Sequence, residues 1–395
     1  MSLIFDTVIV RYGPEIGVKS SRTRAEYDKL LIKSMRARLK ADGLSLEKIE
    51  RRFGRFYVRT TMPKEVALSL SRVFGISSTS PAISCKASLD EISNVALKLA
   101  EERGGRDVKF AIRCRRVGEH SFTSIDVSKY VGAKILESMK DKGWRVDLDR
   151  PDFTINIEIR GNEAFLYIDV VEGVGGLPQG SQGGLLCLMS SGIDSPVAAW
   201  LVMKRGCLVT LLHFNCQQFS GEKTVEKVVD LAKVLAKWSP AYETKLIMVP
   251  FGDVLKEIVE KCPRRLTCLL CKRMMLRIAE KVALSRGLMG IVTGDSIGEQ
   301  ASQTLSNMAV ISSAVKSLPV YRPLLGFDKP ETERIARKIG TYEISARPDE
   351  ECKAAPSKPA ISAKLEEVLE AEKILDIDLL IETSMSRIIE LKSSA

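Results

Sequence analysis

The chain has 395 residues, enough for two or three domains with their own cores, and a net charge of +10. No run approaches 18 consecutive apolar residues, and the first residues, MSLIFDTVIV, lack the basic segment of a signal peptide. We therefore expect no membrane span and a cytoplasmic protein. Nine cysteines, an odd number, favour free thiols, a metal site or catalysis over a disulfide framework.

The positive charge is concentrated at the N-terminus. Residues 1–75 carry 16 Lys and Arg against 8 Asp and Glu, whereas residues 76–175 carry 15 against 16. A polyanion such as RNA would dock on the basic segment. The alternative is a basic face that contacts only solvent, which is the usual explanation of such an excess of Lys and Arg.

The first half of the chain predicts two α+β segments. In residues 5–75 the order is strand, helix, strand, strand, helix, from apolar DTVIVRY, a helical stretch at 24–40, alternation in RRFGRFYVRT and a helical stretch at 64–73. Residues 76–169 follow with helices at 89–102 and 127–139 and strands at 108–113, 153–159 and 164–170.

The second half predicts an α/β domain. After the glycine-rich linker GVGGLPQGSQGG, residues 173–184, strands and helices alternate. Strands are expected at 185–189, 208–214, 245–249 and 290–293, with helices at 196–204, 222–238 and 272–285. This alternation is typical of a doubly wound parallel sheet, in which ligands bind at the carboxyl ends of the strands.

The first of these strand ends carries SSGIDS, residues 190–195. Ser190, Ser191 and Gly192 can aim N–H groups and hydroxyls at a phosphate, and the following helix N-terminus adds partial positive charge. Asp194 could hold a phosphate-bound Mg²⁺ ion. Nothing matches the Walker pattern GxxxxGK[ST]. The loop predicts ATP binding, and the alternative is an ordinary turn in which Asp194 only caps the helix.

SSGIDS resembles the SGGxDS pyrophosphate loop (PP-loop) of the ATP pyrophosphatases, with Ser191 in place of the first glycine. A serine would be strained there if the backbone needed a positive φ. Further blocks stand in order along the chain: RYGPEIGVKS, GVGGLPQGSQGG, TGDSIGEQASQTLSNM and YRPLLGFDKPETERIARKIGTYE. With them the chain resembles the tRNA 4-thiouridine synthetase (ThiI) family from Arg11 to about Cys352, although Pro14 interrupts the usual RYGE.

The resemblance implies three domains. They are a ferredoxin-like domain over 1–75, a THUMP RNA-binding domain over 76–172, and an ATP pyrophosphatase domain (adenine nucleotide α-hydrolase-like) with a helical tail over 173–395. It also implies that tRNA docks on the first two domains. The candidate RNA contacts are basic residues of these domains: Lys19, Arg22, Arg24, Arg52, Arg55, Arg113, Arg115, Arg116 and Lys129.

The same resemblance implies a set of ATP contacts around the loop. They are Leu188, Met189, Ser190, Ser191, Gly192, Asp194, Ser195, His213, Phe214, Lys272, Gly294 and Gln303. Glycine at a strand end permits close backbone approach, and the Gln303 amide can read a base or a ribose. His213 is as well explained as a satisfied core histidine.

The segment CPRRLTCLLCK places Cys268 and Cys271 immediately before a predicted helix. Two thiols at this spacing can share a metal or form a redox pair. The helix N-terminus and the neighbouring Lys272 and Arg273 should favour the thiolate of Cys271. The remaining cysteines in or near strands are expected to be small core residues: Cys85, Cys114, Cys187, Cys207 and Cys216.

For sulfur delivery the resemblance implies an archaeal-type arrangement. The chain ends at Ala395 without the rhodanese domain of bacterial relatives, so we expect Cys268, Cys271 and Cys352 to bind a 3Fe–4S or 4Fe–4S cluster. Cys262 is a candidate fourth ligand or a bystander. Persulfide chemistry without a cluster, and zinc or purely structural thiols, remain alternatives. Sulfide or a cysteine desulfurase would be the sulfur donor.

The implied function is an ATP-dependent sulfurtransferase that adenylates uridine 8 of tRNA and replaces O4 by sulfur to give 4-thiouridine. Asp194, Cys268, Cys271 and Cys352 would be its catalytic residues. Two other classes stay open: a different PP-loop enzyme, such as a 2-thiolating or amide-forming one, and a non-catalytic THUMP RNA-binding protein. Sulfur supply for thiamine biosynthesis is a further role, and the resemblance also suggests a homodimer.

Overall fold

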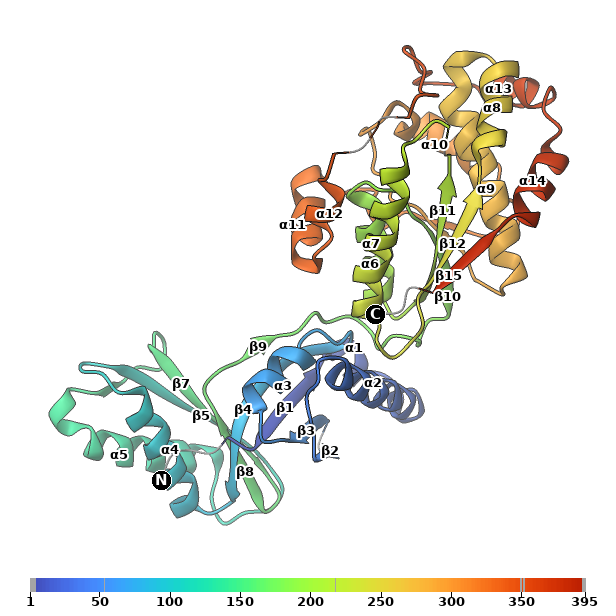
Figure 1. The fold of residues 1–395 in the computed structure, drawn as a ribbon. Coiled ribbons are helices and arrows are strands. Elements are labelled where there is room, and N and C mark those ends of the chain that lie inside the picture. The colour runs from blue at the N-terminus through green and yellow to red at the C-terminus, as the bar shows by residue number, and fades with distance from the viewer. Residues whose placement is uncertain (1–4, 53, 217, 349, 351, 393–395) are drawn as a thin grey trace. The chain divides into compact units, whose positions relative to one another are not determined.

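The computed structural model describes residues 5–52, 54–216, 218–348, 350 and 352–392. They form two compact units, which divide the chain after Leu177. Each unit is built around its own sheet (Figure 1). In the part of the chain that is described, no helix is both long and apolar enough to cross a membrane.

The sheet of the N-terminal unit has nine strands among the described residues, in the order β2-β3-β1-β4-β8-β7-β5-β6, with β9 also beside β4. The strands are β1 (Thr7–Tyr12), β2 (Lys48–Arg52), β3 (Arg55–Arg59), β4 (Ile76–Lys86), β5 (Lys109–Val117), β6 (Arg145–Val146), β7 (Phe153–Arg160), β8 (Glu163–Tyr167) and β9 (Val171–Glu172). Phe53, within the predicted β2–β3 segment, lies outside the described residues.

Strand β4 joins the two halves of this sheet. Its first part pairs with β1, where Thr7 lies opposite Ala82, and its last part pairs with β8, where Ile83 lies opposite Leu166. The sequence analysis does not find this strand. Its sequence, ISSTSPAISCK, is rich in serine and contains a proline, so it lacks the alternation by which strands are recognised.

The helices of the N-terminal unit are α1 (Pro14–Gly17), α2 (Ser21–Ala41), α3 (Pro63–Leu70), α4 (Leu89–Arg103) and α5 (Ser124–Ser138), with a 3₁₀ turn η1 (Lys140–Lys142). The side chains of Ser20 and Ser88 cap α2 and α4, and Thr123 forms a capping box with Asp126 at the start of α5. Helices α2 and α3 share a core with β1 and β3, and α4 and α5 share one with β5 and β7 (Figure 1).

A buried carboxylate lies on β7 of this unit. Glu158 is 2% exposed and pairs with Arg11 at 3.2 Å, with Arg55 at 2.8 Å and with Arg160 at 2.8 Å. Burial alone would raise the pKa of Glu158, but Arg55, Arg11 and Arg160 outweigh it and hold that pKa below its ordinary value. The ion pairs join β1 and β3 to β7 through side chains.

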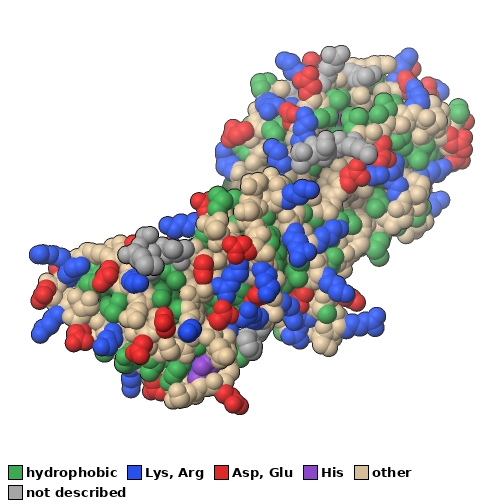
Figure 2. Space-filling view, turned by 60° about the horizontal axis from the view of Figure 1, so that its bottom comes forward, with side chains coloured by type: hydrophobic (Ala, Val, Ile, Leu, Met, Phe, Trp, Pro, Cys, Tyr) green, Lys and Arg blue, Asp and Glu red, His purple; other side chains and the backbone are tan. Residues whose placement is uncertain are grey.

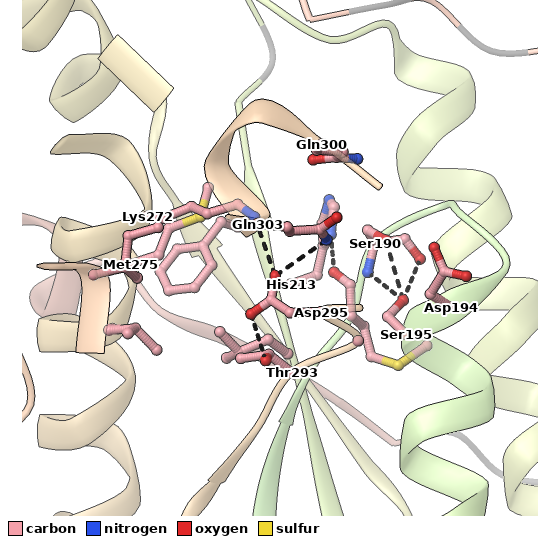
Figure 3. A pocket seen from close by; sticks show the side chains of 16 residues that line it. Ser190, Asp194, Ser195, His213, Lys272, Met275, Thr293, Asp295, Gln300 and Gln303 are labelled. Atoms are coloured by element: carbon pink, nitrogen blue, oxygen red, sulfur yellow. Dashed lines mark hydrogen bonds and ion pairs between the residues drawn. The ribbon is translucent and has the colours of Figure 1, made fainter. Parts of the chain in front are cut away.

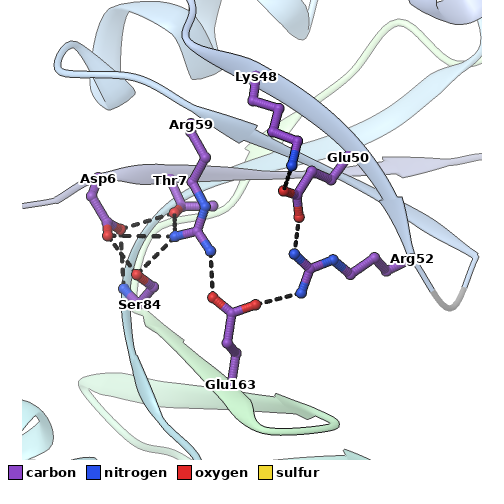
Figure 4. A network of polar contacts seen from close by, with 8 residues as sticks. All are labelled: Asp6, Thr7, Lys48, Glu50, Arg52, Arg59, Ser84 and Glu163. Carbon is purple, nitrogen blue, oxygen red and sulfur yellow. Dashed lines mark hydrogen bonds and ion pairs between the residues drawn. The ribbon is translucent and has the colours of Figure 1, made fainter.

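A second network lies between the same strands and β8 (Figure 4). Arg59 donates to Glu163 at 2.6 Å and to Thr7 at 2.7 Å, and Arg52 pairs with both Glu163 and Glu50. Arg52 and Arg55, two of the candidate RNA contacts, are therefore already neutralised by carboxylates of the same unit.

The sheet of the C-terminal unit has the order β14-β13-β10-β11-β12-β15 in the described residues. Its strands are β10 (Gly184–Leu188), β11 (Leu208–Asn215), β12 (Lys245–Pro250), β13 (Ile291–Val292), β14 (Val320–Tyr321) and β15 (Ile389–Lys392). All pairs are parallel except β12 with β15. The chain proceeds from β10 to β11 and β12 on one side and returns to β13 on the other, so the topological switch point lies at β10.

Helices lie on both faces of this sheet, as the alternation predicts (Figure 1). They are α6 (Asp194–Lys204), α7 (Glu222–Trp238), α8 (Gly252–Lys261), α9 (Thr267–Ser285), α10 (Leu305–Ser312), α11 (Lys329–Ile339), α12 (Tyr342–Ser345), α13 (Leu365–Glu372) and α14 (Ile377–Ser386), with 3₁₀ turns η2 (Arg264–Leu266) and η3 (Ala301–Gln303). Helix α9 begins five residues earlier than the sequence predicts, which changes the setting of Cys268 and Cys271.

Substitution of Glu158 tests the buried network. Glu158→Gln leaves three arginines without their shared counter-charge, and we expect a loss of about 3–5 kcal/mol in the free energy of unfolding at pH 7. The folded pKa of Glu158 is depressed, so its contribution is complete above the unfolded value of about 4.3 and disappears as pH falls through the folded value. Urea titrations at pH 7 and pH 3 measure both effects.

The matched control is Glu119→Gln, because Glu119 is exposed on the same unit. It should change the free energy of unfolding by no more than about 0.5 kcal/mol. Equal stability of Glu158→Gln and Glu119→Gln at pH 7 would contradict the structural role of Glu158.

Candidate active site

Hydrogen bonds to its own serine hydroxyls fix the conformation of the loop at the carboxyl end of β10 (Figure 3). The Ser190 N–H donates to Ser195 Oγ at 2.9 Å, and the two hydroxyl oxygens are 3.1 Å apart. The Gly192 N–H donates to Ser190 Oγ at 3.3 Å. These bonds fold the loop over the start of α6, where the helix dipole and unpaired N–H groups favour an anion.

Ser191 takes no strain from its place in the loop. Among the described residues other than glycine, only Asp107 has a positive φ. The loop therefore forms without the left-handed backbone that would require glycine at position 191. The substitution that separates SSGIDS from SGGxDS is sterically neutral.

A cavity of about 300 Å³ opens beside the loop, between β10, β11, β13 and α9. Ten of the twelve expected ATP contacts line it: Leu188, Met189, Ser190, Asp194, Ser195, His213, Phe214, Lys272, Gly294 and Gln303. Ser191 and Gly192 do not line it. Its further lining residues are Met275, Leu276, Thr293, Asp295, Gln300 and Ile311. The apolar wall with a few polar groups at the rim suits a flat heterocycle joined to an anion.

His213 is held by the strand beside it. Its Nδ1 lies 2.9 Å from the carbonyl oxygen of Met189, which can only accept, so Nδ1 carries a proton and donates. The ring is 5% exposed. The bond fixes the end of β11 to the end of β10, and this is a positioning role rather than acid or base work.

Gly294 brings the end of β13 against the start of α6. A Cβ atom at position 294 would lie 2.8 Å from the Ser195 backbone nitrogen and 2.9 Å from the carbonyl carbon of Asp194. These are backbone atoms that cannot rotate away, so only glycine fits. The close approach at Gly294 is to the backbone of the loop, and its expected contact with the nucleotide stays a prediction.

Asp295 is the polar centre of the cavity, and the sequence analysis missed it. Lys272 donates to it at 3.1 Å, Thr293 at 2.7 Å and Arg322 at 3.4 Å. Gln303 donates from 3.4 Å (Figure 3). Burial alone would raise the pKa of Asp295, but the charge of Lys272 and the Thr293 hydroxyl hold it below its ordinary value. Its signal was the acidic residue directly after the strand-end glycine in TGDS.

Lys329 is the second residue that the sequence analysis missed. Its Nζ lies 2.8 Å and 3.1 Å from the two carboxylate oxygens of Asp194, and 3.4 Å from Glu299. Burial opposes the charge of Lys329, but Asp194 and Glu299 outweigh it and raise its pKa. The residue stands in the block GFDKPETER at the start of α11, where Asp328 and Glu331 form a capping box.

Cys268 and Cys271 lie inside the first turns of α9 rather than before it. Burial raises the pKa of both thiols, that of Cys271 well above its ordinary value. This burial opposes the expected thiolate of Cys271. The cations meant to favour it face other groups, since Lys272 bonds to Asp295 and the buried Arg273 pairs with Glu372.

Electrostatic interactions connect four thiols, two of them at this helix start. Cys271 interacts electrostatically with Cys216, Cys268 and Cys352, and Cys352 also interacts with Cys216 and Cys268. Cys262 lies elsewhere in the core, its thiol donating to the Ala371 carbonyl at 3.5 Å. Within the described residues no three His, Cys, Asp or Glu side chains are close enough to hold one metal ion. A single zinc ion thus finds no ready site here.

Comparison with known proteins covers most of the chain. The family described as "Thiamine biosynthesis protein (ThiI)" matches residues 180–377, a THUMP domain matches residues 86–169, and the ThiI ferredoxin-like domain matches residues 7–80. The chain belongs to the ThiI family. The expected fold class, two α+β modules before a PP-loop α/β domain, is confirmed.

Two of the similar proteins have the same name. Proteins called "Probable tRNA sulfurtransferase" are 39% identical over 98% of this chain and 94% of the protein from Methanosarcina acetivorans, and 41% identical over 98% of this chain and 100% of the protein from Caldanaerobacter subterraneus. A solved complex of a 4-thiouridine synthetase with RNA and bound ATP matches with a TM-score of 0.87, 32% identity, and coverage of 98% and 99% of the two chains.

The candidate RNA contacts in the N-terminal domains differ in their exposure and in the hydrogen bonds that they form within the protein. Lys19, Arg22, Arg113, Arg115 and Lys129 are exposed. Arg24 bonds to the Lys19 carbonyl at 3.2 Å, and Arg116 bonds to the Gly118 carbonyl at 2.9 Å. Lys and Arg side chains are interspersed with Asp and Glu on the face shown in Figure 2, so charge alone marks no single patch on that face.

Substitution of Gly294 tests the close approach in the loop. Gly294→Ala must push the strand end away from α6, and overpacking of this kind costs about 1–3 kcal/mol. We expect ATP affinity to fall about tenfold or more, measured by isothermal titration calorimetry. Gly326→Ala is the control, because a Cβ atom there meets nothing within 4 Å and its φ is not positive. Equal affinities of the two variants would refute the constraint.

Proposed function

We propose that this protein is a tRNA sulfurtransferase that adenylates uridine 8 of tRNA with ATP and replaces O4 by sulfur, giving 4-thiouridine. The observation that carries the proposal is the cavity beside the PP-loop, which ten expected nucleotide contacts line. Support also comes from the relatives named tRNA sulfurtransferase and from the likeness to a 4-thiouridine synthetase bound to RNA and ATP.

The cavity gives each part of ATP a counterpart. Phe214, Met275 and Ile311 offer apolar surface to the adenine, and Gln303 offers an amide. Ser190 and Ser195 line the cavity at the start of α6, where the β- and γ-phosphates would lie. Lys272, oriented by Asp295, places a positive charge beside the α-phosphate, where negative charge increases in the transition state.

The reaction has two displacements. The uridine O4 attacks the α-phosphorus of ATP, the bond to the bridging oxygen breaks, and pyrophosphate leaves. Hydrosulfide then attacks C4, the C4–O4 bond breaks, AMP leaves with the former O4, and a proton is released. The loop's N–H groups stabilise pyrophosphate as it departs, which is the part of the barrier that fixed dipoles lower.

Asp194 is the residue that would hold Mg²⁺. It offers a carboxylate at the mouth of the loop, the hard oxygen ligand that this ion prefers. When bound, Mg²⁺ neutralises the charge that develops on pyrophosphate. In the structure Lys329 forms an ion pair with the Asp194 carboxylate. A Mg²⁺ ion on Asp194 would compete with this ion pair, so Lys329 would then turn toward the phosphates or Glu299.

Cys268, Cys271 and Cys352 would hold an iron–sulfur cluster. Thiolate sulfur is the ligand that iron–sulfur clusters take, and the three thiols interact electrostatically with one another. Thiolates of a cluster bind different irons and so stand farther apart than thiolates around one zinc ion. When bound, the cluster supplies an iron to which hydrosulfide can attach.

The N-terminal domains would bind the tRNA. Lys19 and Arg22 at the start of α2, Arg113 and Arg115 on one face of β5, and Lys129 on α5 offer exposed cations for phosphates. Uridine 8 must leave its place in the folded tRNA to reach the cavity. A cytoplasmic location fits an enzyme of this class.

The proposal is tested with unmodified tRNA, ATP and sulfide under anaerobic conditions, followed by mass spectrometry of the nucleosides. We expect 4-thiouridine from iron-reconstituted protein, none from chelator-stripped protein, and none from a tRNA with cytidine at position 8. Equal product from both protein samples would retain the reaction and remove the cluster from it, because hydrosulfide would then attack C4 without iron. A 2-thiouridine product, or no thiolation, would overturn the proposed reaction.

Asp194→Ala isolates the ATP chemistry. The variant lacks the ligand for Mg²⁺, so pyrophosphate release should fall by about 10²–10³-fold, the effect of removing one preorganised group from a transition state. Binding of tRNA in a filter assay should be unchanged, because the RNA contacts lie in other domains. Asp253→Ala, an acid on α8 that does not line the cavity, is the control. Undiminished pyrophosphate release would remove Asp194 from the mechanism.

A further inference from the structure

Helix α6 cannot supply a donor to one carbonyl of the PP-loop, that of Gly192. The dihedral angles of Ile193 are helical, with φ −70° and ψ −33°, so the peptide between Gly192 and Ile193 continues the geometry of α6. In a regular helix the Gly192 carbonyl would accept from the N–H four residues later. That residue is Pro196, which has no N–H and whose ring crowds the carbonyl.

A hydroxyl from another helix takes the place of this donor. Ser345, the last residue of α12, donates its hydroxyl to the Gly192 carbonyl at 3.2 Å. Its side chain belongs to the buried part of the C-terminal unit, with 9% of the residue exposed, so water competes little for the bond. The PP-loop is thereby joined to a segment 153 residues away in the chain.

Ser345 is itself held in place from α7, beside which α12 lies (Figure 1). The buried Lys227 of α7 donates from Nζ to the Ser345 carbonyl at 3.1 Å and to the Arg347 carbonyl at 2.9 Å. Lysine side chains commonly satisfy the last carbonyls of a helix in this way. Arg347 also pairs with Asp230 of α7 at 2.8 Å. The end of α12 is thus fixed to α7, and the Ser345 hydroxyl has little freedom to leave the loop.

The bond to Ser345 decides the direction of the next N–H group. In a planar trans peptide the C=O and N–H bonds point in opposite directions. With the Gly192 carbonyl held toward α12, the Ile193 N–H lies parallel to the N–H groups at the start of α6. These groups point out of the helix N-terminus, where an anion is favoured. Glycine at position 192 permits other orientations of this peptide at little cost, so an outside contact must select one.

We propose that Ser345 is a positioning residue for the ATP chemistry, because it holds the Gly192–Ile193 peptide so that the Ile193 N–H meets the β- and γ-phosphates and the departing pyrophosphate. The inference rests on the proposed function, since it needs ATP with its phosphates at the PP-loop. Ser345 does not line the cavity and acts only through the loop. Its loss therefore weakens the contacts to the pyrophosphate part of ATP and spares those to the adenine.

Calorimetry with full-length protein and Mg²⁺ tests this role, with ATP, inorganic pyrophosphate and AMP as ligands. We expect Ser345→Ala to bind ATP and pyrophosphate about tenfold more weakly than wild type, the effect of one hydrogen bond. AMP lacks the β- and γ-phosphates, so its affinity should not change. Ser239→Ala is the matched control, because it removes another buried serine hydroxyl of this unit, bonded to Gln179 at 2.9 Å. It should retain all three affinities.

Two further variants separate the hydrogen bond from the general structure of the site. Ser345→Thr keeps a hydroxyl, and its pyrophosphate affinity should stay within about threefold of wild type. Pro196→Ala restores an N–H four residues after Gly192, so in the Ser345→Ala background it supplies the carbonyl with a donor from α6 itself. This double variant should recover most of the lost pyrophosphate affinity.

The outcomes distinguish this inference from the proposed function. Unchanged pyrophosphate affinity in Ser345→Ala, an equal loss of AMP affinity, or no recovery in the double variant would overturn the role of Ser345. A protein that shows the expected affinities but forms no 4-thiouridine retains the role of Ser345 and loses only the proposed reaction. A wild-type protein that binds neither ATP nor pyrophosphate would overturn both.

Discussion

The candidate site depends on one buried carboxylate. Asp295 stands at the end of β13 with its side chain 14% exposed, and a charge in such a place is stable only if it is paired and hydrogen-bonded. Lys272 from α9, Arg322 after β14 and Gln303 from η3 all satisfy it. Three elements distant in sequence are thereby fixed around one cavity. The groups that would meet ATP are in place before it arrives, which is the condition for electrostatic catalysis without reorganisation.

Local patterns predicted the local parts of the site. The strand, SSGIDS and helix form one continuous segment, so spacing alone indicates that its N–H groups converge. Gly294 was predictable because a glycine at a strand end has few other reasons to be there. Lys329 carries no such mark, because a lysine in a polar block is ordinary. Asp295 is marked only by its place directly after the strand-end glycine, and the tertiary contacts show what each of the two residues holds.

The same limit applies to the predictions about cysteine and arginine. The thiolate of Cys271 was inferred from sequence neighbours, but α9 starts early and turns Arg273 toward Glu372, so burial decides the pKa. Arg52 and Arg55 looked like phosphate contacts because their carboxylate partners, Glu163 and Glu158, lie more than a hundred residues along the chain. A count of charges does not show such pairing.

Strand β4 has a consequence for how RNA can be read. Because it pairs with β1 in its first part and with β8 in its last, the ferredoxin-like and THUMP halves share one continuous sheet, braced by Glu158 and Glu163. Two modules on a flexible tether would adapt to many spacings between phosphates. Two modules on one sheet keep a fixed spacing, so an RNA bound by both would be selected by the distance between its backbone segments as well as by its charge.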